Sequence, residues 1–344
     1  MEAQTVRSLI PRRTVNSPRA FFKLSASLVI LLTLAVGALA DERGNSVKVE
    51  RLNFAVQLSD GQTYNVAGYL YYQGSYRNRT LQVALHGGNY NHKYWDAPEI
   101  NGHEYSYARY MARQKYAVLA LDQLGTGESS KPEGDFVTLA ETASAVHQVI
   151  SQLRSGGNQL GYAFNRVVLV GHSLGSINAV YEQGTYHDAD ALVTTGLGHV
   201  PHELPLPLPV IIELAQHPYF SFPEDLRAEL FFYAPDTDPD VIAYDRANLA
   251  DQLARGQLFT AIFTSFDPAA TRVGQVTGPV LVQLGEHDAL FPSSYAAGEA
   301  AFYSNASGVT VQSLPNVGHD VNLQLDNQAA FEMLDEWLRS NDLR

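Results

Sequence analysis

The sequence predicts an α/β protein built on a doubly wound, mostly parallel sheet, and two observations carry that prediction. From residue 47 onward, short apolar runs alternate with segments of helical periodicity. Such runs are typical of strands buried on both faces, and strand–helix alternation is typical of a parallel sheet covered by helices. The 344 residues, of which 45% are hydrophobic and 17% charged, suffice for one large domain with a substantial core.

The expected elements follow one another in order. A hairpin is expected over 47–58 and 64–72, joined at Ser59, Asp60 and Gly61, where turn residues stand. Buried strands are expected over 81–85, 116–121, 166–170, 191–195, 280–284 and 309–314. Helices are expected over 108–114, 138–153, 176–184, 293–302 and 327–338.

One stretch, about 199–274, interrupts this alternation. It opens with four prolines, contains helix-like patches at 210–215 and 240–258, and offers no convincing core strand. A segment of this length is too long for an ordinary loop, so we expect a lid or cap inserted into the domain. Lids commonly shape substrate pockets, although a purely structural excursion is the alternative.

The first forty residues differ from the rest of the chain. Five basic residues precede seventeen uncharged ones over 24–40, which end in Ala38, Leu39 and Ala40. This pattern predicts a signal peptide over residues 1–40, an exported protein comprising 41–344, and no stable membrane span after cleavage. An uncleaved signal anchor is the alternative, because seventeen uncharged residues approach the length that spans a bilayer.

Charge and cysteine content exclude several functions. The formal net charge is −13, and removing residues 1–40 would bring it to about −17, so nucleic acid is not an expected partner. The chain has no cysteine, which excludes thiol catalysis and cysteine-ligated zinc.

The strongest motif is Gly171-His172-Ser173-Leu174-Gly175, a GxSxG pentapeptide between an expected strand and an expected helix. A nucleophilic serine at such a sharp turn needs small residues two positions away on each side. The helix start also favours a developing negative charge. The motif predicts that Ser173 is a nucleophile.

A serine nucleophile needs a base and an acid that orients the base. His319 follows the last expected strand in a glycine-containing loop, and Asp288 follows the strand before it. Because the carboxyl ends of parallel strands share one edge of the sheet, these residues should meet Ser173 there. Glu286 is the direct alternative to Asp288, and Asp267 a more distant one.

Two backbone N–H groups should stabilise the oxyanion. One is expected from Leu174, the residue after the nucleophile. The other is expected from Gly88, with Asn89 as the alternative, because His86, Gly87 and Gly88 follow an expected strand. An aromatic cluster follows this loop and could either line an acyl pocket or simply pack in the core: Tyr90, Tyr94, Trp95, Tyr105, Tyr107 and Tyr110.

These pieces together resemble the α/β-hydrolase superfamily over about residues 53–338. The resemblance lies in the His86-Gly87-Gly88 loop, the segment 122–129, the GHSLG pentapeptide, and the GEHD and GHD segments that contain Asp288 and His319. It implies an α/β-hydrolase fold and a serine hydrolase that acts through an acyl-enzyme. With the leader, we expect a secreted enzyme that cleaves a small ester or lactone, and the Leu- and Pro-rich lid favours an apolar one. No metal or organic cofactor is implied. A peptidase or amidase, or a non-catalytic binding protein of the same fold, remains open.

Overall fold

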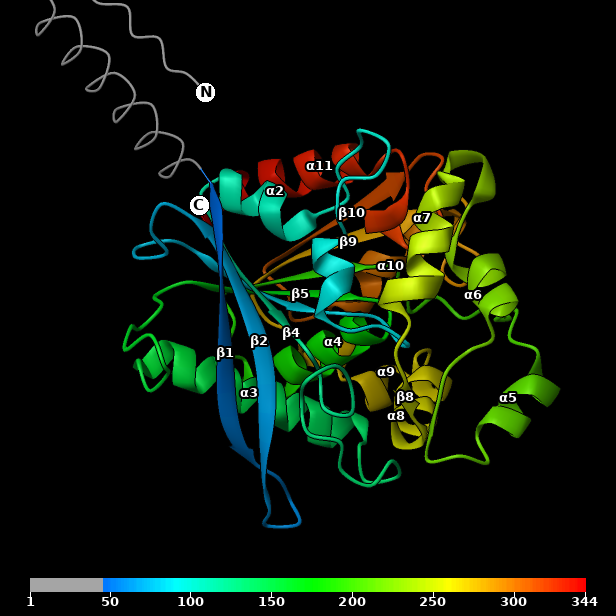
Figure 1. Cartoon of the computed structure of the whole chain (residues 1–344), viewed down its shortest axis with the longest axis horizontal. Coiled ribbons are helices and arrows are strands. Elements are labelled where there is room, and N and C mark those ends of the chain that lie inside the picture. The colour runs from blue at the N-terminus through cyan, green and yellow to red at the C-terminus, as the bar shows by residue number, and fades with distance from the viewer. Residues whose placement is uncertain (1–45) are drawn as a thin grey trace, which may run out of the picture. The chain divides into compact units, whose positions relative to one another are not determined.

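Eight strands form one sheet in the computed structural model, which describes residues 46–344 (Figure 1). Their order is β1-β2-β4-β3-β5-β6-β9-β10, and β2 alone runs in the direction opposite to the other strands. The bounds are β1 Val47–Gln57, β2 Thr63–Gln73, β3 Leu81–Leu85, β4 Ala117–Leu121, β5 Val167–His172, β6 Ala191–Thr195, β9 Pro279–Gly285 and β10 Gly308–Leu314. The mostly parallel sheet is confirmed, with each predicted strand present and its ends within two residues. The leader expected over 1–40 lies outside the described residues.

Helices cover both faces of the sheet, as the alternation predicts. In Figure 1, α2 (Tyr107–Arg113) and α11 (Asn327–Ser340) lie above it, whereas α3 (Leu139–Ser155) and α4 (Leu174–Tyr186) lie below. Every residue of β3, β4 and β6 is buried between these layers. The expected helix over 293–302 is a succession of short turns, η6 Ser293–Tyr295, α10 Ala296–Glu299 and η7 Ala300–Phe302.

The connections from β3 to β4 and from β4 to β5 explain at which edge of the sheet a crevice opens. The chain passes from β3 to β4 on one side and then returns to place β5 on the other side of β3. At such a reversal the connections leave the carboxyl ends of the strands in opposite directions, which opens a crevice between them. The loops after β3 and β5 therefore face each other across this crevice.

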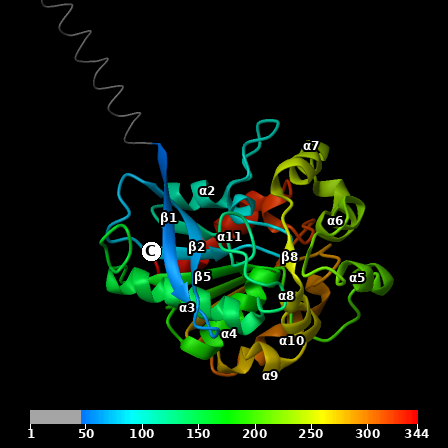
Figure 2. The same cartoon turned by 60° about the horizontal axis from the view of Figure 1, so that its bottom comes forward.

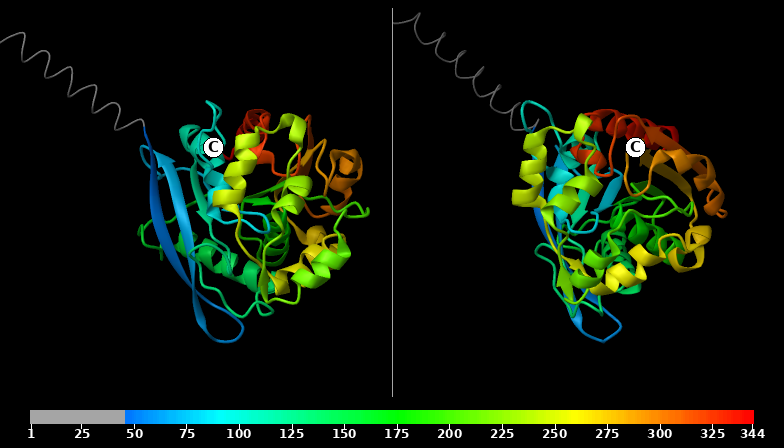
Figure 3. Two further views of the ribbon diagram at one scale, coloured as in Figure 1. Left: turned by 45° about the vertical axis from the view of Figure 1, so that its right-hand side comes forward. Right: turned by 90° about the vertical axis from the view of Figure 1, so that its right-hand side faces the viewer.

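The segment between β6 and β9 contains only short elements, and Figures 2 and 3 show them gathered on one side of the sheet. Two of its residue pairs form a small antiparallel ribbon, β7 with β8. Its elements are α5 Leu208–Leu214, β7 Tyr219–Phe220, α6 Glu224–Phe231, η2 Ala234–Asp236, α7 Pro239–Tyr244, η3 Asp245–Leu249, β8 Leu253–Ala254, α8 Arg255–Thr260, η4 Ile262–Thr264, α9 Pro268–Thr271 and η5 Val273–Gln275. Short helices also occur at η1 His92–Asp96 and η8 Val321–Leu323.

The helix-like patch expected over 240–258 is helical at both ends but interrupted in the middle. The helix ends at Leu249, and the chain then extends through Ala250 to Ala254, where it pairs with β7. In the extended stretch, the N–H of Asp251 donates to the carbonyl of Asn89 at 2.8 Å. These tertiary contacts outweigh the helical propensity of the stretch.

No helix among residues 46–344 combines the length and the apolar character needed to cross a bilayer.

Candidate active site

Ser173 lies at a sharp turn between β5 and α4. Its φ is +51° and its ψ −119°, a conformation that side chains rarely adopt, and its N–H donates to the carbonyl of Thr195 at 2.9 Å. A Cβ at Gly171 would lie 2.5 Å from Gly175 O, and a Cβ at Gly175 would lie 2.1 Å from Leu85 O. Both glycines of the pentapeptide are therefore required by close backbone contacts, as the motif predicts.

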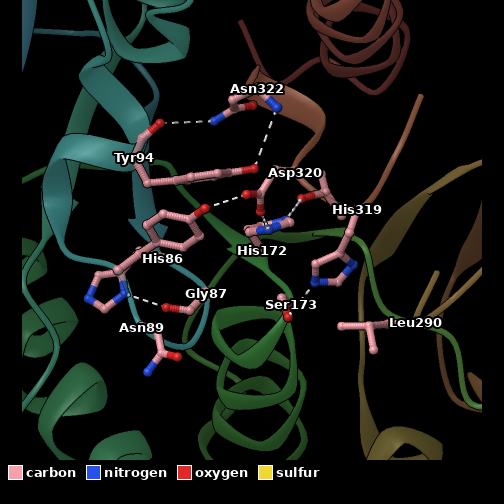
Figure 4. Close-up of polar contacts among 12 residues, drawn as sticks. His86, Gly87, Asn89, Tyr94, His172, Ser173, Leu290, His319, Asp320 and Asn322 are labelled. Carbon is pink, nitrogen blue, oxygen red and sulfur yellow. Dashed lines mark hydrogen bonds and ion pairs between the residues drawn. The ribbon is translucent and has the colours of Figure 1, made fainter. Parts of the chain in front are cut away.

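The structure brings Ser173, His319 and Asp288 together, as the sequence predicts. His319 Nε2 lies 2.8 Å from Ser173 Oγ, and its Nδ1 lies 2.9 Å from Asp288 Oδ2 (Figure 4 shows the serine and the histidine). His319 and Asp288 are buried, at 1% and 3% exposure. The arrangement can move a proton from the hydroxyl to the imidazole while the carboxylate orients the ring.

The electrostatics of this pair favour an ion pair once the imidazole takes a proton. Burial alone would lower the pKa of His319, but the Asp288 carboxylate outweighs it and raises that pKa above the usual value. Burial alone would raise the pKa of Asp288, but the charge of His319 and the N–H groups of Leu290 and Phe291 hold it below the usual value. Asp288 thus stays ionised beside the base.

The two alternative acids lie elsewhere. The Glu286 side chain is 52% exposed and accepts the N–H of Asn316 at 3.2 Å. Asp267 caps α9, where it accepts the N–H of Ala269 at 2.9 Å. Neither has a hydrogen bond to His319 among the described residues, so the geometry favours Asp288.

The loop after β3 lies against the turn that holds the serine. A Cβ at Gly87 would lie 3.3 Å from the Cβ of Ser173, and Gly88 lines the same pocket as Ser173 and Leu174. Leu174 is the first residue of α4, so its N–H has no partner within the helix. These positions suit the oxyanion donors expected from the sequence.

The loop is held from two sides. On one side, buried His86 contacts Thr126 Oγ1 at 3.0 Å through Nε2, and Gln123 Nε2 donates to His86 O at 2.7 Å. The segment 122–129, quoted in the family resemblance, therefore anchors the loop after β3.

On the other side, the segment between β6 and β9 holds Asn89. Arg227, which is 2% exposed, donates to Asn89 O at 3.1 Å, and the N–H of Phe222 donates to Asn89 Oδ1 at 2.9 Å. Arg227 is itself paired with buried Asp245 at 2.5 Å. Asn89 has φ +62°. Its side chain and carbonyl fix the segment between β6 and β9 to the loop after β3.

A second imidazole–carboxylate pair lies directly beside the first, and sequence reasoning assigned it no role. His172 Nε2 lies 3.0 Å from Asp320 Oδ1, and Asp320 also accepts the hydroxyl of Tyr90. The His172 ring stacks on Tyr94, with ring centroids 4.5 Å apart, and lies 5.0 Å from the ring of His319 (Figure 4). His172 directly precedes Ser173 and Asp320 directly follows His319, but their contact spans 148 residues and leaves no local signal.

An apolar pocket opens onto Ser173. Its walls suit carbon-rich groups, because the described lining residues include no charged side chain. The apolar lining consists of Leu174, Ile177, Leu204, Leu206, Phe222, Phe231, Leu253, Ile262, Leu290 and Phe291.

The aromatic cluster that follows the loop after β3 packs in the core and does not line the pocket beside Ser173. Tyr90, Tyr94, Trp95, Tyr105 and Tyr107 are at most 2% exposed, and the described pocket lining includes none of them. Of the two interpretations left open by the sequence, packing is the one that the structure favours.

Comparison with known proteins identifies the family. Residues 82–332 match the family described as "Alpha/beta hydrolase family", which is more than half of the chain. The chain belongs to the alpha/beta hydrolase family. The resemblance stated from the sequence motifs is therefore confirmed.

Solved structures similar to this alpha/beta hydrolase share its fold at low sequence identity. A monoacylglycerol lipase from Paleococcus ferrophilus is 16% identical, with a TM-score of 0.59, covering 86% of this chain and 99% of that one. An esterase from Exiguobacterium antarcticum is 18% identical, with a TM-score of 0.60 and coverage of 83% and 99%. A 2-hydroxy-6-oxo-6-phenylhexa-2,4-dienoate hydrolase from Rhodococcus sp. strain RHA1 is 15% identical, with a TM-score of 0.59 and coverage of 86% and 100%.

Proposed function

We propose that this alpha/beta hydrolase is a secreted serine esterase that cleaves a small apolar carboxylic ester or lactone. The observation that carries the proposal is the contact of 2.8 Å between Ser173 Oγ and His319 Nε2, with Asp288 on the far side of the ring. Family membership supports hydrolysis in general, and the esterase and lipase among the similar folds are consistent with an ester bond.

The proposed reaction has two halves. His319 accepts the proton of Ser173 as its oxygen attacks the ester carbonyl, and the N–H groups of Leu174 and Gly88 stabilise the oxyanion. His319 then donates the proton to the departing alcohol, which leaves an acyl group on Ser173. Water activated by the same histidine cleaves this acyl-enzyme. Asp288 remains ionised throughout and stabilises the imidazolium.

The pocket lining supports the ester over the peptide alternative. A peptidase that anchors a charged substrate terminus needs a charged group near the nucleophile, and the described pocket lining has none. An apolar acyl or alcohol group would lose water-exposed surface on entering, which favours binding. We therefore expect short apolar esters to be better substrates than charged peptides or amides.

Secretion is the part of the proposal that depends on the leader. The basic residues, the uncharged run over 24–40 and the small residues before position 41 support export and cleavage. Sequencing the amino terminus of the protein recovered outside the cell would test this: a start at Asp41 is expected, and a retained leader would indicate an anchor.

The Ser173→Ala variant tests the catalytic role. We expect loss of nearly all hydrolysis of a short-chain activated ester, by about 10⁴-fold or more in kcat, with unchanged circular dichroism. Full activity in the variant would refute the esterase proposal. Failure of a folded wild-type protein to hydrolyse any ester, lactone or amide would instead favour a non-catalytic binding protein.

A further inference from the structure

Three ionisable side chains meet far from the pocket, at the opposite end of α4. His147 comes from α3, Glu182 from the last turns of α4, and Asp188 from the loop between α4 and β6. Glu182 is eight residues after Leu174, which places it about 12 Å further along the helix axis. The cluster therefore plays no direct part in the reaction at Ser173.

The three residues present their ligand atoms to one another. One such atom from each lies within 4.8 Å of the other two. The closest pair is His147 Nδ1 and Asp188 Oδ2, at 2.7 Å. Glu182 is completely buried.

Three carboxylate oxygens of the cluster are buried without a hydrogen-bond donor among the described residues: both oxygens of Glu182 and Oδ1 of Asp188. The nearby cation, Arg154, is engaged elsewhere. Its Nε donates to the carbonyl of Asp188 at 2.7 Å, its Nη2 to the Asp190 carboxylate at 2.8 Å, and its Nη1 to Asn165 O at 3.2 Å. The cluster thus lacks a donor for these oxygens.

Ionised carboxylates are acceptors only, so two that face each other need either a shared proton or a cation. Burial, together with the neighbouring charge of Asp188, raises the pKa of Glu182 well above its usual value. Burying an unpaired carboxylate costs free energy, because the charge loses its hydration. Coordination of a metal ion offsets that cost.

We propose that His147, Glu182 and Asp188 form a binding site for a divalent transition-metal ion, with Zn²⁺ as the ion that fits best. An imidazole nitrogen with two carboxylate oxygens is a donor set that suits zinc, and a water molecule can complete a tetrahedron. Calcium is less suitable, because it prefers six to eight oxygen ligands.

The geometry requires only small side-chain movements. Ligand atoms around tetrahedral zinc lie about 3.4 Å apart, given metal–ligand distances of about 2.0 to 2.2 Å. The three atoms already lie within 4.8 Å of one another, and the pair at 2.7 Å would open slightly. The bound ion would link α3, α4 and the loop before β6.

The site also has an entry path and an oriented ligand. The side chains of His147 and Asp188 are 36% and 18% exposed, so an ion can reach them from solvent. The His147 ring stacks on Tyr186, with centroids 4.0 Å apart, which holds Nδ1 toward the carboxylates.

Zinc binding to the purified mature protein tests the proposal. After chelator treatment and reloading with ZnCl₂, we expect one equivalent of Zn²⁺ to survive dialysis, as measured by mass spectrometry of the metal. Zn²⁺ should also raise the melting temperature of the wild-type protein, because an ion that binds only the folded state stabilises it.

Two variants and a control locate the ion. Glu182→Gln and His147→Ala should each weaken Zn²⁺ binding by at least about tenfold, measured by calorimetry. The matched control His217→Ala, which removes an exposed histidine in another segment, should bind as the wild type does. His147 is partly exposed, so its variant should fold even if the substitution at buried Glu182 does not.

Absence of Zn²⁺ binding by the wild type would overturn the proposal and leave a shared proton between the two carboxyl groups. Equal Zn²⁺ affinity in the wild type and in His147→Ala would overturn it as well.

Discussion

Two imidazole–carboxylate pairs lie side by side in this protein, and their surroundings shift the pKa values of the two imidazoles in opposite directions. His319 with Asp288 contacts Ser173, whereas His172 contacts Thr195 Oγ1 and stacks on Tyr94, and Asp320 accepts the hydroxyl of Tyr90. The pKa of His319 is raised, but that of His172 lies well below the usual value, because burial and the charge of His319 both oppose its protonation. Residue type alone therefore does not make a general base.

The carboxylates differ for a related reason. Asp288 accepts two backbone N–H groups, from Leu290 at 2.7 Å and Phe291 at 2.9 Å, and its pKa is lowered. Burial raises the pKa of Asp320 to about 6, although the Tyr90 hydroxyl partly opposes the shift. The charge of His319 and two backbone donors keep Asp288 ionised, so the first pair is the one arranged to hold an imidazolium directly.

The largest difference in kcat between the two pairs should come from removing the charge of Asp288. In Asp288→Asn the amide cannot stabilise the imidazolium and favours the wrong tautomer of His319, so kcat should fall by about 10⁴-fold. Steady-state kinetics with an activated ester measure this. A loss smaller than that of Asp320→Asn would reverse the roles assigned to the two pairs.

The isosteric change Asp320→Asn should have a much smaller effect, less than about tenfold in kcat/KM on the alkaline plateau. The charge of Asp320 raises the pKa of His319, and hydrolysis needs His319 neutral. In the wild type, kcat/KM should therefore fall as pH decreases through a value above about 6.5. Without the Asp320 charge, this acid limb should move to lower pH.

A pH profile of kcat/KM for both proteins measures that shift. An acid limb that stays in place or moves to higher pH in Asp320→Asn would show that the second pair does not act on His319.

The smallest effect should come from Tyr90→Phe. Loss of the hydroxyl leaves Asp320 without one of its donors, which should lower the free energy of unfolding by about 1 to 3 kcal/mol. Activity on the alkaline plateau should change little. Denaturant unfolding measures the difference, with Tyr94→Phe as the matched control, because its buried hydroxyl accepts only a 3.5 Å contact from Asn322. Equal losses in the two variants would contradict a specific role for Tyr90.

Much of this organisation could be predicted from local sequence. The strands are short apolar runs. Gly171 and Gly175 indicate the close backbone contacts that such a strand-to-helix turn requires. Position along the chain favoured Asp288 as the acid and left Glu286 and Asp267 as alternatives, and the geometry favours Asp288 over both. The predictable features, the strands and the turn at Ser173, are those that short stretches of sequence determine.

The features that could not be predicted depend on contacts between distant residues. The helix-like patch expected over 240–258 is interrupted around Asp251, whose N–H donates to the carbonyl of Asn89, more than 160 residues earlier in the chain. Likewise, neither GHSLG nor GHD indicates that His172 and Asp320 pair with each other. Such pairings become visible only once the sheet brings the loops together.

Covalent labelling tests the central claim most directly. The wild-type protein is treated with a fluorophosphonate probe, digested, and mapped by mass spectrometry. The adduct should lie on Ser173, and labelling should be slowed strongly in Asp288→Asn but little in Asp320→Asn. An adduct on another residue, or equal labelling rates in the two variants, would contradict the account.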